Sequence, residues 1–227
     1  MKSPYEVIIV DNASTDGTLT LLKSFQSHKV IVNKKNLGFA TACVSAVKHA
    51  KGEYLLFLNP DVALRSDILS LLFPLFKDTT IGVAGPMITN PDGSVQPSVR
   101  AFPTLTSQLL ILLKAHHISK NIPVLKHYFA KGFNYKKEQD VDQVMGAAFL
   151  TTRAVWDAVG GFDTRFFIWF EEVDYCYQVK KLGYRVVYSP KASIVHKGAE
   201  SFSQINVIRK QFWFLRSIVT YFIKNGI

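Results

Sequence analysis

A carboxylate stands directly after one of the most apolar segments of this sequence. Residues Tyr54–Leu58 are predicted to form a buried strand, and Asn59, Pro60 and Asp61 follow it at once. A hard divalent cation such as Mg²⁺ or Mn²⁺ is bound by one or two carboxylates together with phosphate oxygens. The position of Asp61 therefore indicates a cation site that faces a phosphorylated ligand, with helix capping as the structural alternative. Asn59 is neutral, but its side chain can bond a ribose hydroxyl or a water molecule.

Two adjacent glutamates, Glu171 and Glu172, form the second candidate for chemistry. They open a predicted helix over Glu171–Leu182, and the helix dipole alone favours acidic residues at a helix start. The same dipole keeps a carboxylate ionised at neutral pH, which a general base requires. The aromatic stretch before them, Phe166–Phe170, is predicted to be mostly core, although the flat ring of Trp169 could stack on a sugar.

The elements that must position these residues alternate between strand and helix in the first part of the chain. Short β-branched runs predict strands and longer periodic segments predict helices; the strands are 6–10, 30–32, 54–58 and 81–84, and the helices are 19–25, 39–50 and 67–76. This alternation predicts a mostly parallel sheet with right-handed crossovers. Asp11, Asn36 and Asp61 all follow strands, so we expect three polar loops to converge on one cleft at the carboxyl edge of the sheet.

The later part of the chain is less regular. Residues 97–140 are predicted to form a helical or irregular insertion, followed by a strand over 144–151 and a helix over 153–159. Two short strands are predicted over 185–188 and 192–195, and His196 follows the second. A long amphipathic helix is predicted over 205–224. We therefore expect one α/β domain over 1–200 and a C-terminal amphipathic helix within 201–227.

The composition excludes several classes of protein. The chain has 227 residues, a formal charge of +10 and two cysteines, Cys43 and Cys176, without metal-ligand spacing. Neither a dinucleotide-binding Gly-x-Gly-x-x-Gly nor a P-loop sequence is present. No basic run is interleaved with stacking aromatics, so no nucleic-acid partner is expected. The charge leaves open an anionic membrane surface, anionic small substrates or a basic surface without a specific partner. No signal peptide or membrane span is apparent in this sequence.

Several short blocks in a fixed order carry a resemblance to a known family. They are Val10–Gly17, Asn36–Ala40, Leu58–Asp61, Met145–Ala148, Gly160–Asp163, Phe166–Asp174 and Val195–Gly198. In this order they resemble the family 2 glycosyltransferases, and Asn-Pro-Asp in place of Asp-x-Asp is typical of the rhamnosyltransferase-like branch. The resemblance extends from Tyr5 to about Gly198. It implies an α/β fold of the GT-A type, with a mostly parallel sheet flanked by helices.

The resemblance also implies a site for a nucleoside diphosphate sugar. The residue that matches Asp11 contacts the nucleotide base in the family, and the loop that matches Asn36 and Gly38 closes over the nucleotide. The remaining residues expected at this nucleotide-sugar site are Asn12, Asn59 and Asp61. A late histidine completes the metal shell of many GT-A enzymes, and it matches His196, so the expected metal ligands are Asp61 and His196.

On the acceptor side, similar proteins carry Glu-Asp where this chain has Glu171 and Glu172, with the Asp as general base. The resemblance therefore implies Glu172 as the base, with Glu171 and Asp174 as the other catalytic candidates of the block. Gly146 and Trp169 are expected to face the acceptor.

Together these expectations describe a metal-dependent, inverting glycosyltransferase. The donor expected from the resemblance is dTDP-rhamnose, and the acceptor is a hydroxyl of a cell-surface polysaccharide or a lipid-linked glycan. The protein is expected in the cytoplasm, with peripheral contact between its C-terminal helix and the anionic inner face of the cell membrane.

Family members begin with a further strand–loop–helix unit, and this sequence starts too late to contain it. The fold is therefore expected to be N-terminally truncated relative to the family. Two alternatives stay open on the sequence alone: a non-catalytic remnant that binds ligand without turnover, and a nucleotidyltransferase, which can share such a sheet and a metal-binding carboxylate.

Overall fold

The main sheet gathers strands from the whole length of the chain. The computed structural model describes residues 4–24, 28–118, 121–198 and 206–227. The central path of the sheet runs β3, β9, β5, β10, β4, and these strands are Tyr54–Leu58, Ala148–Thr152, Ile81–Thr89, Arg185–His196 and Val62–Leu64. Strand β10 runs parallel to β5, whereas β9 is antiparallel to both β3 and β5. The α/β fold is confirmed, and the sheet is mixed because β9 inserts antiparallel between β3 and β5.

A smaller unit precedes this sheet. Strand β1 (Ile8–Asp11) pairs in parallel with β2 (Lys29–Val32), and helices α1 (Thr18–Lys23) and α2 (Phe39–Val47) complete the unit. Within the described ranges, this pair forms a two-stranded sheet of its own and does not join the ladder of β3. The strand-end loops at residues 11 and 61 therefore belong to two different sheets rather than to one continuous edge.

Alternating side chains place one apolar layer on each face of the main sheet. Phe57 and Phe149 pack on one face, against helices α7 (Arg153–Val159) and α8 (Glu171–Lys181). Ala148 and Leu150 face the other side, where α3 (Ile68–Leu72) and the 3₁₀ turn Phe73–Lys77 cover them. This period of two is what a strand buried on both faces requires. The sheet is thereby held rigidly, and the loops at its ends are held with it.

Prolines explain two differences from the predicted elements. The helix predicted over 67–76 is α3, capped by Asp67, followed by the 3₁₀ turn that contains Pro74. The two strands predicted over 185–188 and 192–195 are one strand, β10, whose register shifts between Ser189 and Ser193. Pro190 lies in this shift, where it removes no hydrogen bond of a regular ladder.

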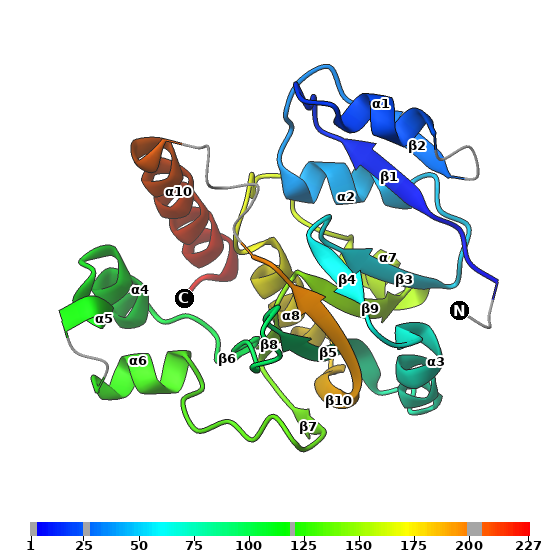
Figure 1. Ribbon diagram of the computed structural model, residues 1–227. Coiled ribbons are helices and arrows are strands. Elements are labelled where there is room, and N and C mark those ends of the chain that lie inside the picture. Colours follow the sequence, from blue (N-terminus) through cyan, green and yellow to red (C-terminus); the bar gives the residue numbers. More distant parts are fainter. Residues whose placement is uncertain (1–3, 25–27, 119–120, 199–205) are drawn as a thin grey trace.

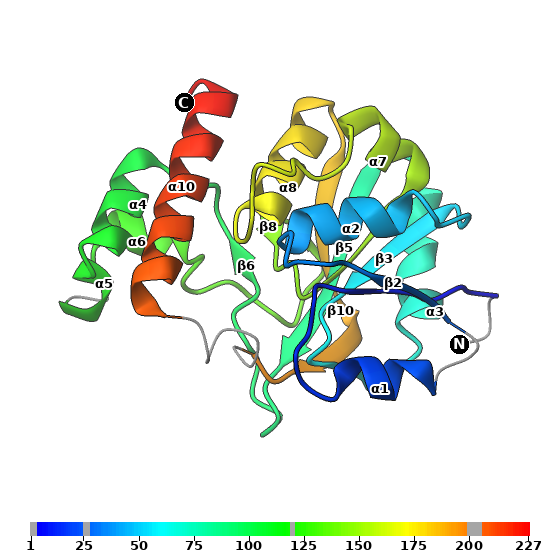
Figure 2. The ribbon, with the colours of Figure 1, turned by 90° about the horizontal axis from the view of Figure 1, so that it is seen from above.

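The predicted insertion is helical, and it lies to one side of the sheet. It contains β6 (Val99–Arg100), α4 (Leu105–Leu112), α5 (Ala115–Ile118), α6 (Pro123–Tyr128) and β7 (Gln139–Asp140), and β8 (Gln143–Val144) follows it. Helix α10 (Val207–Asn225) lies beside α4 in both views of the molecule (Figures 1 and 2). The strand predicted over 144–151 is divided into β8 and β9, with Gly146 in the connection. Within the described ranges, no helix is both long enough and apolar enough to cross a membrane.

Candidate active site

Asp61 and His196 meet at one end of the main sheet. Strands β4 and β10 are antiparallel, and their register pairs Val62 with His196, so the residue before Val62 comes beside the imidazole. The Nε2 atom of His196 lies 3.3 Å from Oδ1 of Asp61, and both side chains are 11% exposed. The two residues predicted as metal ligands, 135 positions apart in the chain, are therefore adjacent in space.

Gln96 orients this histidine. Its Oε1 lies 2.8 Å from Nδ1 of His196. An amide oxygen only accepts hydrogen bonds, so Nδ1 of His196 is the donor to Gln96, and a neutral imidazole held in this way presents the lone pair of Nε2 to Asp61. Two acceptor atoms 3.3 Å apart favour a positive charge between them, either a proton or a cation. A carboxylate, an imidazole and a partner that fixes the imidazole fit a divalent cation. Within the described ranges, no group of three or more His, Cys, Asp or Glu side chains has metal-binding spacing, so a cation here takes its other ligands from substrate or water.

The N-terminal unit contains four of the predicted nucleotide-binding residues, Asp11, Asn12, Asn36 and Gly38. Asn12 donates from Nδ2 to the carbonyl of Gly38 at 3.2 Å, and it accepts a bond from Asn33 at 2.8 Å. Asn36 accepts from the N–H of Gly38 at 2.9 Å. Asp11 is buried at the end of β1 and accepts from the N–H of Ser14 at 3.0 Å. Asn12 and Asn36 therefore shape the loop at residue 38.

Gly38 lets this loop touch the segment that precedes the two glutamates. Its φ is +85°, and a Cβ atom at this position would lie 2.3 Å from the carbonyl oxygen of Phe167. The next residue, Phe39, donates its N–H to that same carbonyl at 2.9 Å. The glycine was expected to allow close approach to a nucleotide; the structure shows that the closest neighbour is the backbone of Phe167. Only glycine fits both the dihedral angle and the space.

Glu171 and Glu172 begin helix α8, as predicted, and their carboxyl groups are shielded from water. The Oε1 of Glu172 accepts a bond from the N–H of Gly146 at 3.3 Å. Within the described part of the chain, the Oε2 atoms of both glutamates are buried and have no hydrogen-bond partner. Gly146 is close enough that a Cβ atom there would lie 3.3 Å from the Glu172 carboxyl. The glycine therefore leaves the space that this carboxyl occupies.

Burial, rather than the helix dipole, sets the direction in which the pKa values of this pair are shifted. Burial raises the pKa of Glu171 well above its ordinary value, and the negative charge of Glu172 raises it further. Burial also raises the pKa of Glu172, while the N–H groups of its own turn and of Gly146 and the charge of Arg100 oppose the rise. The dipole was expected to keep Glu172 ionised; burial outweighs it. A base whose pKa lies nearer to neutral pH takes a proton more effectively.

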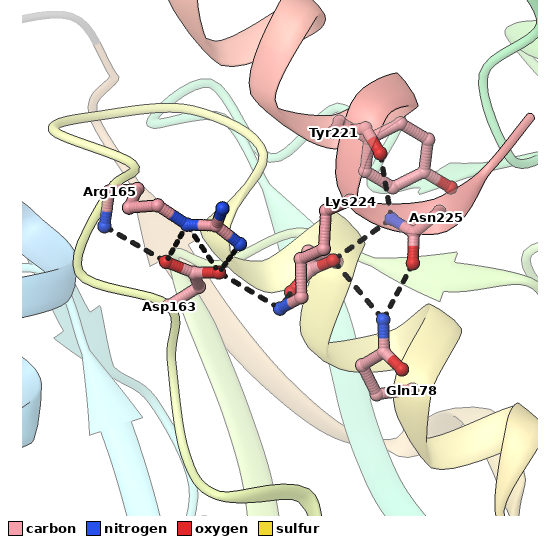
Figure 3. A network of polar contacts seen from close by, with 7 residues as sticks. Asp163, Arg165, Gln178, Tyr221, Lys224 and Asn225 are labelled. Atoms are coloured by element: carbon pink, nitrogen blue, oxygen red, sulfur yellow. Dashed lines mark hydrogen bonds and ion pairs between the residues drawn. The ribbon is translucent and has the colours of Figure 1, made fainter.

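Asp174, the third catalytic candidate of this block, lies in a network of polar contacts between α8 and α10. Its Oδ2 lies 2.6 Å from Nζ of Lys224, and its Oδ1 accepts from Asn225 at 3.1 Å and from Gln178 at 3.4 Å. Lys224 also lies 3.0 Å from Asp163, which pairs with Arg165 (Figure 3). These bonds occupy both oxygens of Asp174. Asp174 therefore attaches α8 to α10 and is not placed to accept a substrate proton.

The aromatic segment before α8 is strained and held in place by α10. Trp169 and Phe170 have φ values of +60° and +71°, a region that bulky residues rarely adopt. Ser217 donates to the carbonyl of Ile168 at 2.9 Å, and the ring of Trp169 packs edge-on against Phe214. Trp169 was predicted to face an acceptor sugar; its partly buried ring packs against α10.

Sequence reasoning missed the residues that support the site. Gln96 and Lys224 lie far from their partners along the chain, and neither stands in a recognisable motif. One usable signal was the basic character of the last turn of the C-terminal helix. A buried acid on α8 required a cation from another element, and Lys224 supplies it.

Comparison with known proteins places the chain among glycosyl transferases. Residues 1–159 match the family described as glycosyl transferase family 2. The N-acetylglucosaminyl-diphospho-decaprenol L-rhamnosyltransferase of Mycobacterium tuberculosis is 30% identical over 211 residues, which cover 87% of this chain and 68% of that protein. The rhamnosyltransferase WbbL of Escherichia coli is 24% identical over 98% of this chain and 84% of its own length.

The fold has counterparts among solved structures. The mannosyltransferase PcManGT of Pyrobaculum calidifontis, solved with GDP-Man and Mn²⁺, superposes with a TM-score of 0.61 and 18% identity. The match covers 97% of this chain and 54% of that protein, so the chain spans about half the length of this structural neighbour. The likeness supports the GT-A type of fold.

Proposed function

The chain belongs to glycosyl transferase family 2, and we propose from this premise that it moves rhamnose from dTDP-rhamnose to a hydroxyl of a lipid-linked glycan. The observation that carries the proposal is the buried, unpartnered Oε2 of Glu172 beside Gly146. A buried carboxyl oxygen without a partner is costly, and a substrate hydroxyl that donates to it removes that cost. The sugar and the lipid-linked acceptor are inferred from the names of the rhamnosyltransferases to which the chain is similar, and the dTDP carrier is the expectation stated from the family resemblance.

In the proposed reaction, Glu172 takes the proton of the acceptor hydroxyl as its oxygen attacks the anomeric carbon. The new carbon–oxygen bond forms on the face opposite the diphosphate. The bond to the diphosphate breaks with its electrons, and the nucleoside diphosphate leaves. Attack from the opposite face inverts the anomeric configuration. Burial and the charge of Glu172 raise the pKa of Glu171 well above its ordinary value, so we propose that Glu171 keeps its proton while Glu172 acts as the base.

Asp61 and His196 would hold a divalent cation, and Gln96 would keep the imidazole in the required tautomer. When bound, the cation supplies positive charge beside the leaving diphosphate. Asp61→Ala is expected to abolish the Mn²⁺-dependent part of dTDP binding in calorimetry, while the thermal unfolding curve stays cooperative. Equal Mn²⁺-dependent affinity in the variant and the unaltered chain would rule out this cation site.

We also propose that α10 contacts an anionic membrane surface. Ile208, Phe212 and Ile223 are 78%, 61% and 75% exposed, although they are large apolar side chains. Arg209 and Arg216 are exposed on the same helix, which contains no acidic residue. An apolar face flanked by basic residues suits the interface of a bilayer with anionic lipids. This placement brings the protein to a lipid-linked acceptor.

The experiment that tests the central proposal is a donor and acceptor screen. The purified chain is incubated with Mn²⁺, a panel of nucleotide sugars that includes dTDP-rhamnose, and an N-acetylglucosamine alkyl diphosphate. Mass spectrometry detects the product, and NMR reads its anomeric configuration. Transfer of rhamnose with inversion is the expected result. Transfer of no sugar by a chain that binds dTDP would contradict it and favour a binding protein without turnover.

A further inference from the structure

The helical insertion has an unusual distribution of charge. Between Asp92 and Glu138 the sequence contains no acidic residue. The same stretch contains several basic residues, which are Arg100, Lys114, Lys120, Lys126, Lys131, Lys136 and Lys137. A segment that carries only positive charge attracts anions. Lysines scattered over helices do not define a site, but one basic residue of this stretch has an anchored backbone next to the strand that leads to Gly146, the hydrogen-bond partner of Glu172.

That residue is Arg100, at the end of β6. The N–H of Val99 donates to the hydroxyl of Tyr135 at 3.3 Å, and the N–H of Ala101 donates to the carbonyl of Tyr128 at 3.0 Å. The register of β6 and β8 sets Arg100 opposite Gln143. The backbone on both sides of Arg100 is therefore anchored. The side chain starts from a fixed point, unlike that of a lysine in a mobile loop.

Aromatic rings hold the guanidinium group, and no acid neutralises it. Its central carbon lies 5.4 Å from the ring centre of Phe129 and 5.7 Å from that of Tyr128. Among the described residues, no carboxylate forms an ion pair with Arg100, whose side chain is exposed. A guanidinium that stacks on rings keeps its N–H edge free for two parallel bonds to a phosphate.

Arg100 also lies on the acceptor side of the proposed site. Strand β8, which pairs with β6, leads within two residues to Gly146, whose N–H donates to Glu172. The positive charge of Arg100 acts on the Glu172 carboxyl. Arg100 therefore lies on the strand paired with the one that leads to Gly146, near enough to the proposed base for the two charges to interact. Asp61 and His196, which would face the donor diphosphate, lie on different strands, at the β4–β10 end of the sheet.

We propose that Arg100 binds a phosphate group of the acceptor, and that this contact selects acceptors whose sugar is linked to a lipid diphosphate. This inference rests on the proposed function, because it assigns the acceptor subsite of the same centre. The guanidinium binds the diphosphate oxygens while the sugar hydroxyl reaches Glu172. Arg100 is thus a residue for acceptor recognition, and it takes no part in the proton transfer.

The test compares two synthetic acceptors in detergent, free of phospholipid, with dTDP-rhamnose as donor. One is an N-acetylglucosamine alkyl diphosphate, and the other is the same sugar on a neutral alkyl chain. Arg100→Gln is expected to raise KM for the diphosphate acceptor about 10- to 100-fold, the loss typical of hydrogen bonds to a charged group. Any change in kcat that arises because the charge of Arg100 no longer acts on Glu172 is expected to be the same for both acceptors. The rise in KM for the diphosphate acceptor, relative to the KM for the neutral acceptor, is therefore the quantity that tests the proposal. The KM of Arg100→Lys for the diphosphate acceptor is expected to lie between those of Arg100→Gln and the unaltered chain, because lysine keeps the charge but lacks the two parallel N–H donors of the guanidinium.

Lys126→Gln is the matched control, since it removes the same charge from the same insertion. A loss as large as that of Arg100→Gln would mean that general charge attracts the acceptor, and it would overturn the assignment to Arg100. Equal losses on both acceptors would also overturn it, because Arg100 would then act through Glu172. No loss on either acceptor overturns it outright.

A binding measurement separates this inference from the proposed function. The alkyl diphosphate acceptor is titrated into the chain by calorimetry in EDTA, without donor or metal. Binding that is lost in Arg100→Gln and kept in Lys126→Gln supports the subsite even if no transfer is detected. Binding that is equal in both variants overturns it even if transfer is robust. In a last measurement, binding of the chain to phosphatidylglycerol vesicles is compared between the variants. If Arg100→Gln weakens vesicle binding and leaves acceptor binding unchanged, Arg100 binds a lipid headgroup and the assignment to the acceptor is wrong.

Discussion

Glu172 and Asp174 lie within one turn of helix α8, and the fold treats their carboxylates in opposite ways. Asp174 is almost fully buried, and three side chains from α8 and α10 occupy both of its oxygens. Glu172 keeps one buried oxygen without a partner, and its neighbour Glu171 does the same. Lys224 neutralises Asp174, whereas no cation forms an ion pair with Glu171 or Glu172 among the described residues.

Whether a buried carboxylate has hydrogen-bond partners distinguishes an acid that holds the fold together from a candidate for catalysis, and it does so better than position in the sequence. A satisfied carboxylate stays ionised and fixed, and it joins two elements. An unsatisfied buried carboxylate is a cost to stability, and such costs are retained where a substrate relieves them. These unsatisfied oxygens support the proposal that the Glu171–Glu172 end of α8 is the catalytic end, and the contacts of Asp174 mark the point where α10 is attached.

The largest effect is expected for the unpaired acid. Glu172→Gln keeps the size of the side chain and its bond from Gly146 but cannot accept a proton, so kcat is expected to fall roughly 10²–10⁴-fold. Binding of dTDP, measured by calorimetry, should change little. Asp174→Asn is the comparison variant: if it removed transfer while Glu172→Gln kept it, the roles assigned to these two acids would be reversed.

Loss of the ion pair of Asp174 is expected to lower the free energy of unfolding. Lys224→Met removes the cation and leaves Asp174 buried with a charge, a change that costs about 3 kcal/mol of unfolding free energy, at the low end for buried pairs because Lys224 is 24% exposed. Urea unfolding measures it. Arg209→Met, on the exposed side of the same helix, is the control and should cost little. A Lys224→Met chain of unaltered stability would mean that the contact of α10 with Asp174 does not hold the fold together.

The two sets of acids should also give opposite dependences of stability on pH. Burial raises the pKa of Glu171, so the folded chain holds a proton that the unfolded chain releases near pH 4.5. The contribution of this proton to the free energy of unfolding is lost as the pH rises from there through the raised pKa. The loss is at most about 1.4 kcal/mol per pH unit. Arg165 and Lys224 lower the pKa of Asp163, so its stability is present above the ordinary pKa near 3.8 and is lost as pH falls below it.

Glu171→Gln is therefore expected to flatten the decline in stability between about pH 5 and pH 8 and to leave the acid side unchanged. Melting curves across this range measure the effect. Asp163→Asn should do the reverse, with its main effect above pH 4. An unchanged alkaline slope in Glu171→Gln would mean that the buried pair holds no extra proton.

The smallest effect is expected for a substitution on the exposed face of α10, the helix whose last turn contacts Asp174. Arg216→Gln is expected to weaken sedimentation with phosphatidylglycerol vesicles about fivefold, since a basic residue near an anionic surface contributes about 1 kcal/mol. Added salt should reduce the difference. Arg65→Gln, on the loop before α3, serves as the control for net charge. Equal sedimentation of both variants would remove α10 from the membrane contact.

Much of the fold followed from local pattern. The strand Tyr54–Leu58 and the helix Arg153–Val159 have the predicted bounds, because each is a uniform run with a clear signal at both ends. The pairing of strands could not be predicted in the same way. Nothing in residues 148–152 shows that they run antiparallel between two strands that are parallel to each other. Such register depends on contacts between distant segments.

The site was predictable to a similar extent. Asp61 was named from its position after a buried strand and His196 from the resemblance, and the structure places the two side chains 3.3 Å apart. The raised pKa of Glu172 was not foreseen, since burial depends on how β8 and α8 pack, whereas the helix dipole can be read from position alone. Asp174 was grouped with the glutamates because they are neighbours in sequence. A helix turns 100° per residue, so neighbours point to different surroundings.

The central place of β10 in the sheet also determines when the fold can form during synthesis. Strand β4 ends at residue 64, yet its ladder partner is β10, which spans residues 185–196. Strand β5 likewise pairs in parallel with β10 across about a hundred residues of chain. While a ribosome extends the polypeptide through the insertion, both strands present open hydrogen-bonding edges, and His196 is not yet available to Asp61. Contacts of such long range slow folding and prolong the exposure of strand edges. A nascent chain of this protein should therefore depend on chaperones until β10 has emerged.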